Sequence, residues 1–268
     1  MPPEHRRGLR LIDTHYGGDV SRIVVGGVTH VPGDTVLAKR EWLQRDGDAL
    51  RRLLLGSPYG EPSMCANVIV DTTLEHAEAG YVIMEAMGYP HFSGSNSICV
   101  TTALLESGHI PFGPPGHQTV HLEAPAGLIR AEVEHDGRHV HAVTLACDPS
   151  WVVERGRTAE LPEFGTVTYD VVWSGCFYAV VDAEAQGFAL TEAERHVLRD
   201  FGLELCLVAG PELELVHPDF GDTGDLSFVS FSGPVLDGDD GPETRTATYV
   251  HPGVVCRCPT GTGTAARL

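Results

Sequence analysis

A hydroxyl–glycine–hydroxyl turn, Ser93-Gly94-Ser95-Asn96-Ser97, leads into a run that is apolar on nearly every side and ends at Gly108. A turn of this kind, followed by an apolar run and a glycine stop, predicts a helix. A helix without a polar face must lie inside a domain, so the rest of the chain has to fold around it. Its N-terminus would present free backbone N–H groups and the positive end of the helix dipole.

The same pattern returns near the end of the chain as Thr260-Gly261-Thr262-Gly263-Thr264. Helix N-termini bind anions because their first N–H groups lack partners. Two matching helix starts therefore indicate two half-sites that face one small anion.

Composition excludes several partner classes. The chain has 268 residues, 18 Lys and Arg against 37 Asp and Glu, and a net charge of −19, which disfavours nucleic acid and anionic membranes. No apolar leader follows the N-terminal arginines, and no run reaches membrane-spanning length. The seven cysteines are odd in number and scattered, unlike a secreted disulfide framework, so a cytoplasmic location is expected.

The first part of the chain reads as strands followed by the apolar helix. Helix start and stop signals predict a helix over 36–55 that is broken near Asp46-Gly47-Asp48. Alternation of apolar and polar residues predicts four strands, at 9–15, 21–25, 64–70 and 79–84. The Pro/Gly cluster at 110–116 marks the expected domain boundary.

The second part is expected to be richer in strands. Asp136-Gly137 predicts a hairpin, and Thr191-Glu192-Ala193-Glu194 is a capping box for a helix that ends at Gly202. The run 237–241 is expected to be a solvated loop. The predicted strands are 120–123, 127–135, 139–144, 167–172, 176–181, 212–217, 226–231 and 246–250.

This order of elements predicts an α+β fold and not a doubly wound parallel sheet. The expected domains are 1–116 and 117–268. The second glycine turn is followed by only a few residues, so we expect the protein to continue beyond this sequence.

With both turns placed, the chain resembles the proline racemase family, which includes hydroxyproline epimerases and trans-3-hydroxyproline dehydratases. The matching segments, in order, are Ile12–Gly18 with Arg22–Gly27, Ser93–Ser97, Gly175–Val180 and Arg257–Gly263. Each is a modest glycine-rich pattern alone, but together they are specific.

The resemblance implies two pseudo-symmetric domains of the diaminopimelate-epimerase type, each a sheet wrapped around a central helix. It also implies a site between them that needs no cofactor, a small imino acid such as proline or hydroxyproline as partner, and a possible homodimer.

The family removes the α-proton of a cyclic imino acid, and backbone N–H groups at the two helix starts would stabilise the charge on its carboxylate. Here those groups would come from Gly94, Ser95, Asn96, Gly261 and Thr262. Glycine turns that merely start core helices are the alternative explanation.

Racemases of the family place a cysteine on each face of the α-carbon, and the resemblance assigns those positions to Ser93 and Thr260. An alcohol is a far weaker acid than a thiol and needs a neighbouring base. Threonine at the second position is what the family's dehydratases carry. Serine at the first position occurs in the family together with a cysteine at the second.

Two further departures concern the substrate amine. The family usually has histidine where this chain has Ser95, and aspartate where it has Cys256.

Other residues could supply a base. Cys256, Cys258, Cys176 and His15 are candidates, although a free cysteine is more often a small buried hydrophobe. Cys256 and Cys258 with His251 could suggest a metal, but the spacing is untypical. His139 and His141 share one strand face and are expected to be solvated.

Three functions remain open at this point. The first is dehydration of trans-3-hydroxy-L-proline, the second is proline racemisation or hydroxyproline 2-epimerisation, and the third is binding of an imino acid or other small carboxylate without turnover.

Overall fold

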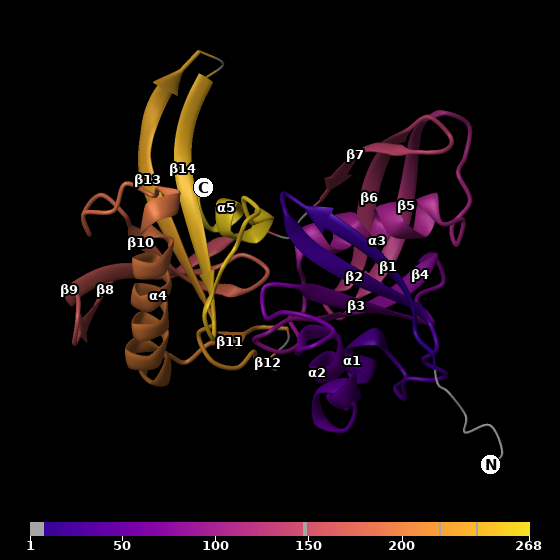
Figure 1. Cartoon of the computed structure of the whole chain (residues 1–268), viewed down its shortest axis with the longest axis horizontal. Coiled ribbons are helices and arrows are strands. Elements are labelled where there is room, and N and C mark those ends of the chain that lie inside the picture. Colours follow the sequence, from indigo (N-terminus) through magenta and orange to yellow (C-terminus); the bar gives the residue numbers. More distant parts are fainter. Residues whose placement is uncertain (1–7, 147–148, 220, 240) are drawn as a thin grey trace. The chain divides into compact units, whose positions relative to one another are not determined.

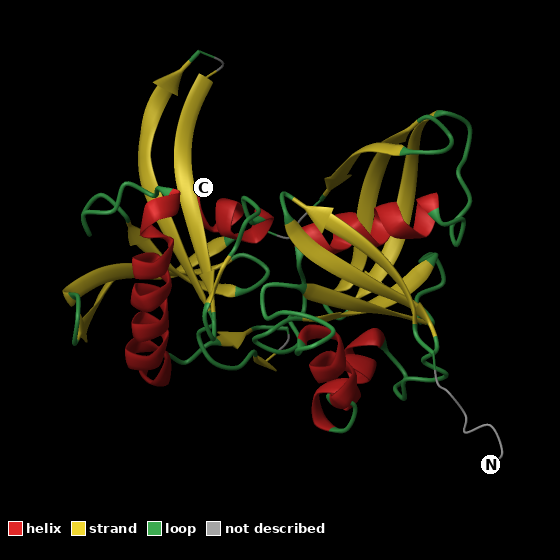
Figure 2. Cartoon of the chain, in the orientation of Figure 1, coloured by secondary structure: helices red, strands yellow, loops and turns green. Residues whose placement is uncertain are grey.

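A computed structural model describes residues 8–146, 149–219, 221–239 and 241–268. Its two compact units are Met1–Cys147 and Asp148–Leu268, called unit 1 and unit 2 below (Figure 1). The boundary differs from the one expected at residue 116. The Pro/Gly cluster lies inside unit 1, because the three strands that follow it continue the first sheet. The expected α+β class is confirmed, with a large sheet and packed helices in each unit (Figure 2).

Unit 1 contains a seven-stranded sheet in the order β1-β2-β3-β4-β5-β6-β7. The β2–β3 and β4–β5 pairs are parallel and the other neighbours are antiparallel. The strands and helices of unit 1 are β1 Arg10–Tyr16, β2 Asp19–Gly26, α1 Val36–Arg45, α2 Ala49–Leu55, β3 Cys65–Val70, β4 Ala79–Met84, α3 Gly94–Glu106, β5 Gly116–Ala124, β6 Gly127–His135 and β7 Val140–Leu145.

The two faces of this sheet bury different helices. Side chains alternate along a strand, so Ile83 packs with the core around α3 while its neighbour Met84 packs with the core of α1 and α2. On α3, Val100 and Leu104 are at most 1% exposed. The sheet curls around α3, and α1 and α2 lie on its other face (Figures 1 and 2). The expected sheet wrapped around an apolar helix is present in unit 1.

Several local predictions in unit 1 are confirmed. The helix break at Asp46–Asp48 separates α1 from α2. The Asp136 side chain accepts hydrogen bonds from the N–H groups of Arg138 and His139, which closes the turn between β6 and β7. Gly108 has φ +76°, the left-handed conformation expected after a helix C-terminus.

Unit 2 contains a six-stranded sheet in the order β15-β14-β13-β10-β9-β8, in which β10 and β13 are parallel. Its elements are β8 Trp151–Leu161, β9 Gly165–Trp173, β10 Phe177–Asp182, η1 Glu192–Glu194, α4 Arg195–Ala209, η2 Gly210–Glu212, β11 Val216–His217, β12 Gly221–Asp222, β13 Phe228–Gly238, β14 Gly241–Val250, β15 Val254–Val255 and α5 Gly261–Arg267.

The main core of unit 2 lies between its sheet and α4. Phe201 on α4 is fully buried and packs edge-on against Phe164, Phe188 and Phe231, with ring centroids 5.0, 5.5 and 5.4 Å away. The helix expected at the second glycine turn is α5, a shorter element that buries Gly263 and Ala266. The helix that forms most of the unit 2 core is therefore α4.

Four expectations for unit 2 need correction. The helix that follows the capping box does not stop at Gly202 but continues to Ala209. Strand β8 was not predicted, the strand expected over 212–217 is reduced to β11, and the expected loop over 237–241 is partly taken up by β13 and β14. Most side chains of β8 face solvent, so its sequence shows little of the apolar and polar alternation that would predict a strand.

Gly202 is in the helix interior for a packing reason. A Cβ at this position would lie 2.3 Å from Cγ of Tyr249, whose buried ring belongs to β14. The glycine allows α4 to approach the sheet closely, and local sequence does not distinguish this role from a helix stop.

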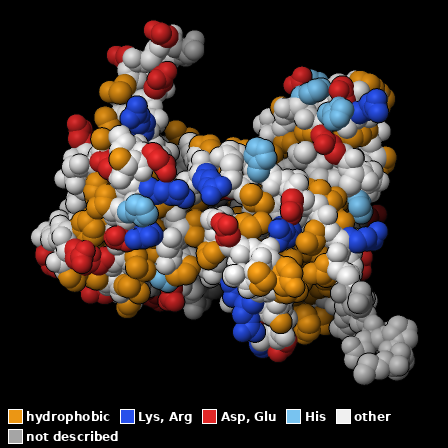
Figure 3. Space-filling view, in the orientation of Figure 1, with side chains coloured by type: hydrophobic (Ala, Val, Ile, Leu, Met, Phe, Trp, Pro, Cys, Tyr) orange, Lys and Arg blue, Asp and Glu red, His pale blue; other side chains and the backbone are white. Residues whose placement is uncertain are grey.

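Charged side chains of both signs lie on the surface of the molecule (Figure 3). Acidic and basic side chains are both spread over the face in Figure 3. Within the described ranges, no helix is long and apolar enough to cross a membrane.

Replacing Gly202 with alanine tests this contact. Alanine would favour the helix by about 1 kcal/mol, yet the Tyr249 clash should dominate and lower the free energy of unfolding by about 1–3 kcal/mol. Urea denaturation measures the change. Leu207→Ala, at a 60% exposed site on the same helix, is the control and should change stability little. A Gly202→Ala variant more stable than wild type would contradict the packing argument.

Candidate functional site

Ser93 is the N-cap of α3. Its backbone is extended, with φ −153° and ψ 117°, and its Oγ accepts a hydrogen bond from the Asn96 N–H at 3.4 Å. The same oxygen accepts from Asn96 Nδ2 at 2.9 Å and lies 3.3 Å from Ser95 Oγ. The side chain predicted to stand at the first catalytic position is therefore also part of the helix cap.

The turn leaves two donors available. Among the described residues, the N–H groups of Gly94 and Ser95 have no hydrogen-bond acceptor, whereas the N–H of Asn96 is bound to Ser93. A Cβ on Gly94 would meet only Leu145 Cδ1, at 3.9 Å, so the space beside the Gly94 α-carbon is open within unit 1. Two free N–H groups at a helix N-terminus suit a carboxylate.

Asn96 was expected to donate its N–H to the ligand, but its side chain has a different role. It is 1% exposed and Nδ2 donates to Glu85 Oε1 at 2.9 Å as well as to Ser93. Its Oδ1 accepts from Ser21 Oγ at 3.0 Å and from Asn67 Nδ2 at 2.6 Å. The amide thus ties α3 to β2, β3 and the end of β4.

Glu85 lies directly after β4 and has an altered acidity. Burial raises its pKa from 4.5 to about 7, although hydrogen bonds from Cys65 and Asn96 act in the opposite direction and nearby Asp19 adds to the rise. Burial also raises the pKa of the Cys65 thiol well above its usual value, and the Glu85 charge contributes. The Glu85 carboxyl group, which titrates near neutral pH, is therefore linked to Ser93 through the side-chain amide of Asn96.

The second turn has a strained start. Thr260 has φ +49° and ψ 97°, a conformation rare for a β-branched residue and costing about 1–3 kcal/mol. Its Oγ1 donates to the Cys258 carbonyl at 3.5 Å and lies 3.8 Å from Cys258 Sγ. Strain of this kind is often retained at functional sites.

The other residues predicted at this turn are also placed. Gly261 begins α5, and a Cβ added there would meet no atom within 4 Å, whereas Thr262 Oγ1 lies 2.6 Å from the Tyr178 hydroxyl. The Cys256 N–H donates to the Thr248 carbonyl, and Cys256 lines a cavity of about 660 Å³ together with Cys258. The two turns lie in different units, so their convergence on one ligand stays a prediction.

The remaining candidates show no additional site. His15 on β1 is exposed, and His139 and His141 lie 3.5 and 3.6 Å from the Asp136 carboxylate in an exposed cluster, as expected for a solvated pair. Among the described residues, no group of three or more His, Cys, Asp or Glu side chains is arranged to hold a metal.

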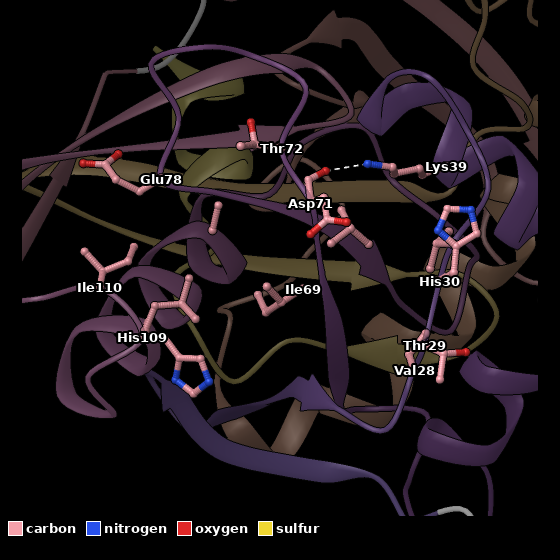
Figure 4. Close-up of a pocket in the computed structure, with 14 residues that line it drawn as sticks. Val28, Thr29, His30, Lys39, Ile69, Asp71, Thr72, Glu78, His109 and Ile110 are labelled. Atoms are coloured by element: carbon pink, nitrogen blue, oxygen red, sulfur yellow. Dashed lines mark hydrogen bonds between the residues drawn. The ribbon is translucent and has the colours of Figure 1, made fainter.

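A separate cavity of about 400 Å³ lies elsewhere in unit 1 (Figure 4). Its lining includes His30, His109 and the buried Lys39, whose Nζ donates to the Asp71 carbonyl at 2.5 Å. Asp71 follows the C-terminal end of β3, whereas Cys65 begins that strand. The predicted site residues do not line this cavity.

Sequence reasoning missed the residues that surround Asn96. They are Ser21, Cys65, Asn67 and Glu85. Glu85 is a lone carboxylate directly after the apolar strand predicted over 79–84, and this position could have indicated a buried functional group. Asn67, in the middle of an apolar strand, was a second signal, since a buried amide needs partners.

Removing the helix cap should weaken unit 1. Ser93→Ala deletes the oxygen that binds the Asn96 N–H and Nδ2, so the free energy of unfolding should fall by about 0.5–2 kcal/mol. Urea denaturation followed by circular dichroism measures this. Ser95→Ala, which changes a neighbouring half-buried hydroxyl that does not cap the helix, is the matched control. An equal loss in both variants would contradict the capping role.

The Glu85 carboxyl should make stability depend on pH. Its pKa is about 7 in the folded chain, against the reference value of 4.5, so folding takes up a proton between these values. The contribution of Glu85 to the free energy of unfolding is therefore greatest below about pH 4.5 and is lost as the pH rises to about 7. Glu85→Gln should remove this dependence, and Glu134→Gln at an exposed position should retain it. Parallel pH curves for wild type and Glu85→Gln would contradict the shift.

Known proteins are similar to this chain over nearly its whole length. The chain is 47% identical over 261 residues to a protein of Chromohalobacter salexigens, covering 97% of this chain and 72% of that protein. It is 36% identical over 266 residues to the 4-hydroxyproline 2-epimerase of Agrobacterium fabrum, covering 98% and 75%.

Two solved structures are similar over nearly the whole chain. One is a hydroxyproline epimerase from Agrobacterium vitis with bound trans-4-hydroxy-L-proline, with TM-score 0.90, 35% identity, and coverage of 98% of this chain and 76% of that one. The other is a probable proline racemase from Agrobacterium radiobacter with bound carbonate, with TM-score 0.89, 34% identity, and coverage of 97% and 76%. The proline racemase family itself matches residues 11–268, and the chain belongs to that family.

Proposed function

We propose that the chain performs α-proton chemistry from one side of a cyclic imino acid and dehydrates trans-3-hydroxy-L-proline. The observation that carries this proposal is the pair of alcohols, Ser93 and Thr260, at the positions where the family's racemases use thiols. Racemisation needs an acid on the face opposite the base, whereas elimination of a β-hydroxyl needs one base and no proton returned to the α-carbon. A site without two thiols is better suited to elimination.

The substrate carboxylate would bind at the start of α3. The free N–H groups of Gly94 and Ser95 and the helix dipole would hold it and stabilise the charge that develops as the α-proton leaves. The open space beside Gly94 leaves room for a ligand oxygen. The related structures, with trans-4-hydroxy-L-proline in one and carbonate in the other, support a carboxylate-bearing imino acid as the ligand class.

A second candidate is 2-epimerisation of a 4-hydroxyproline. The names of the relatives at 35–36% identity favour it. It would require Thr260 or a nearby group to return a proton on the opposite face, and Cys258 Sγ lies 3.8 Å from Thr260 Oγ1.

A third candidate is binding without turnover. Ser93 Oγ accepts two hydrogen bonds from Asn96, and within the described residues no carboxylate or imidazole is hydrogen-bonded to it to take its own proton. Ser93 alone is therefore a poor base, which favours this candidate unless another group removes the α-proton.

Proton NMR in heavy water distinguishes the three candidates. Incubation with proline, 4-hydroxyproline and trans-3-hydroxy-L-proline should consume only the last and release a pyrroline-2-carboxylate, which an amine-trapping reagent also detects. Formation of a deuterated 4-hydroxyproline epimer would instead establish the second candidate. Saturable binding with no exchange or product for any ligand would establish the third.

Gly94→Ala serves as a control for the carboxylate site in the same assay. The new methyl group has room in unit 1, so folding should be unchanged, but it would occupy the approach to the free N–H groups. KM should rise clearly more than kcat falls. An unchanged KM would place the substrate carboxylate elsewhere.

A further inference from the structure

A carboxyl group stands beside the position of the missing first thiol. Glu85 Oε1 and Ser93 Oγ each accept a hydrogen bond of 2.9 Å from the same nitrogen, Asn96 Nδ2. The two oxygens are thus held next to one another by one buried amide. Ser93 is followed directly by Gly94 and Ser95, whose free N–H groups form the proposed carboxylate site.

The backbone around Glu85 is fixed from two directions. Glu85 and Gly88 exchange backbone hydrogen bonds of 2.8 and 3.1 Å across a tight turn in which Gly88 has φ +130°. Arg51 Nη1 donates to the carbonyls of Glu85 and Ala86, each at 3.2 Å, and Arg51 itself is bound to Asp48. The carboxyl is therefore positioned by a rigid turn, as an acid–base group requires.

Three groups face Glu85, whose own pKa of about 7 lets it take a proton near neutral pH. They are Cys65 from β3, Asn96 from α3 and Asp19 from β2. The Cys65 thiol is held in its neutral form by burial and by the neighbouring negative charge, so it can donate to the carboxylate but is not a ready thiolate. Asn96 is a donor without a titratable proton, and Asp19 disfavours a second negative charge.

We propose that Glu85 is the acid–base residue of this site and acts in place of the family's first thiol. This assignment rests on the proposed α-proton chemistry. Asn96 is then a positioning residue that orients the carboxylate, and Ser93 is a neighbour that completes the wall of the site.

The elimination balances with one carboxyl group. The Glu85 carboxylate takes the α-proton, and the electron pair of the broken C–H bond forms the double bond between the α- and β-carbons. The bond from the β-carbon to its hydroxyl breaks, and that oxygen leaves with the electron pair and the proton from Glu85 as water. Glu85 returns to its ionised form, and no oxidant, reductant or second base is required.

Two variants and a matched control test the assignment. Glu85→Gln keeps an oxygen for Asn96 Nδ2 but cannot accept a proton, so turnover and α-deuterium exchange should fall by about 100-fold or more, with ligand binding retained within a few-fold. Cys65→Ala removes a donor to the Glu85 carboxylate, so it should keep most of the turnover with the midpoint of its pH profile displaced upward. Glu134→Gln on β6 is the control for loss of a carboxylate and should stay close to wild type. Circular dichroism and ligand-induced chemical shifts establish that each variant folds and binds.

The pH profile provides a readout that a structural role would not move. Because a base must be ionised, the wild-type kcat/KM should rise with pH and level off above about 7, where Glu85 is deprotonated. Glu85→Asp should keep a measurable rate with a displaced midpoint.

The outcomes separate this assignment from the proposed function. An active wild type with an equally active Glu85→Gln variant would overturn the role of Glu85 alone, and loss of activity only in Cys65→Ala would transfer the role to the thiol. A wild type that binds imino acids but shows neither exchange nor product would overturn the proposed function, and the role of Glu85 with it.

Discussion

The buried amide of Asn96 holds the start of α3 against the sheet of unit 1. A polar group with almost no exposure must be fully hydrogen-bonded, because an unpartnered one costs roughly 1–3 kcal/mol. Asn96 meets this demand with Ser21, Asn67, Glu85 and Ser93, which lie on or next to β2, β3, β4 and α3. One side chain thereby fixes the N-terminus of α3 relative to the sheet that surrounds it. The free N–H groups of Gly94 and Ser95, in the same turn, are consequently held in a fixed direction.

This network also explains how a site that lacks a thiol at Ser93 can retain an acid–base group. The family resemblance assigns the two catalytic positions to Ser93 and Thr260, and both side chains are alcohols. The structure adds a carboxyl group one amide away from the first of them, with its pKa raised by burial to about 7. Such a group can take and return a proton near neutral pH, which neither serine nor threonine does unaided. The chemical capacity of unit 1 therefore depends on the cluster around Asn96 and not on Ser93 alone.

Most of the regular structure could be predicted from local patterns. The break between α1 and α2, the Asp136 hairpin, the wrapped helix α3 and its Gly108 stop all follow from turn residues and periodicity. The failures have distinct physical causes. Gly202 resembles a helix stop but allows α4 to approach Tyr249. The charged and glycine residues at 154–157 interrupt the apolar pattern of β8, so alternation does not identify that strand. The Pro/Gly cluster at 110–116 resembles a boundary, yet the strands after it pair with the sheet before it.

The amino-acid sequence alone is enough to predict the class of fold and to identify the two glycine turns, the family resemblance and the alcohols at both expected thiol positions. These are properties of short segments, and short segments carry their own turn and helix preferences. The tertiary structure alone decided that Cys65, Glu85 and Asn96 form one cluster beside Ser93. Those residues are separated by up to 31 positions in the chain, and pairing of β3 with β4 together with the packing of α3 brings them together. The acidity of Glu85 was also decided there, since it arises from burial and from neighbours that no local pattern specifies.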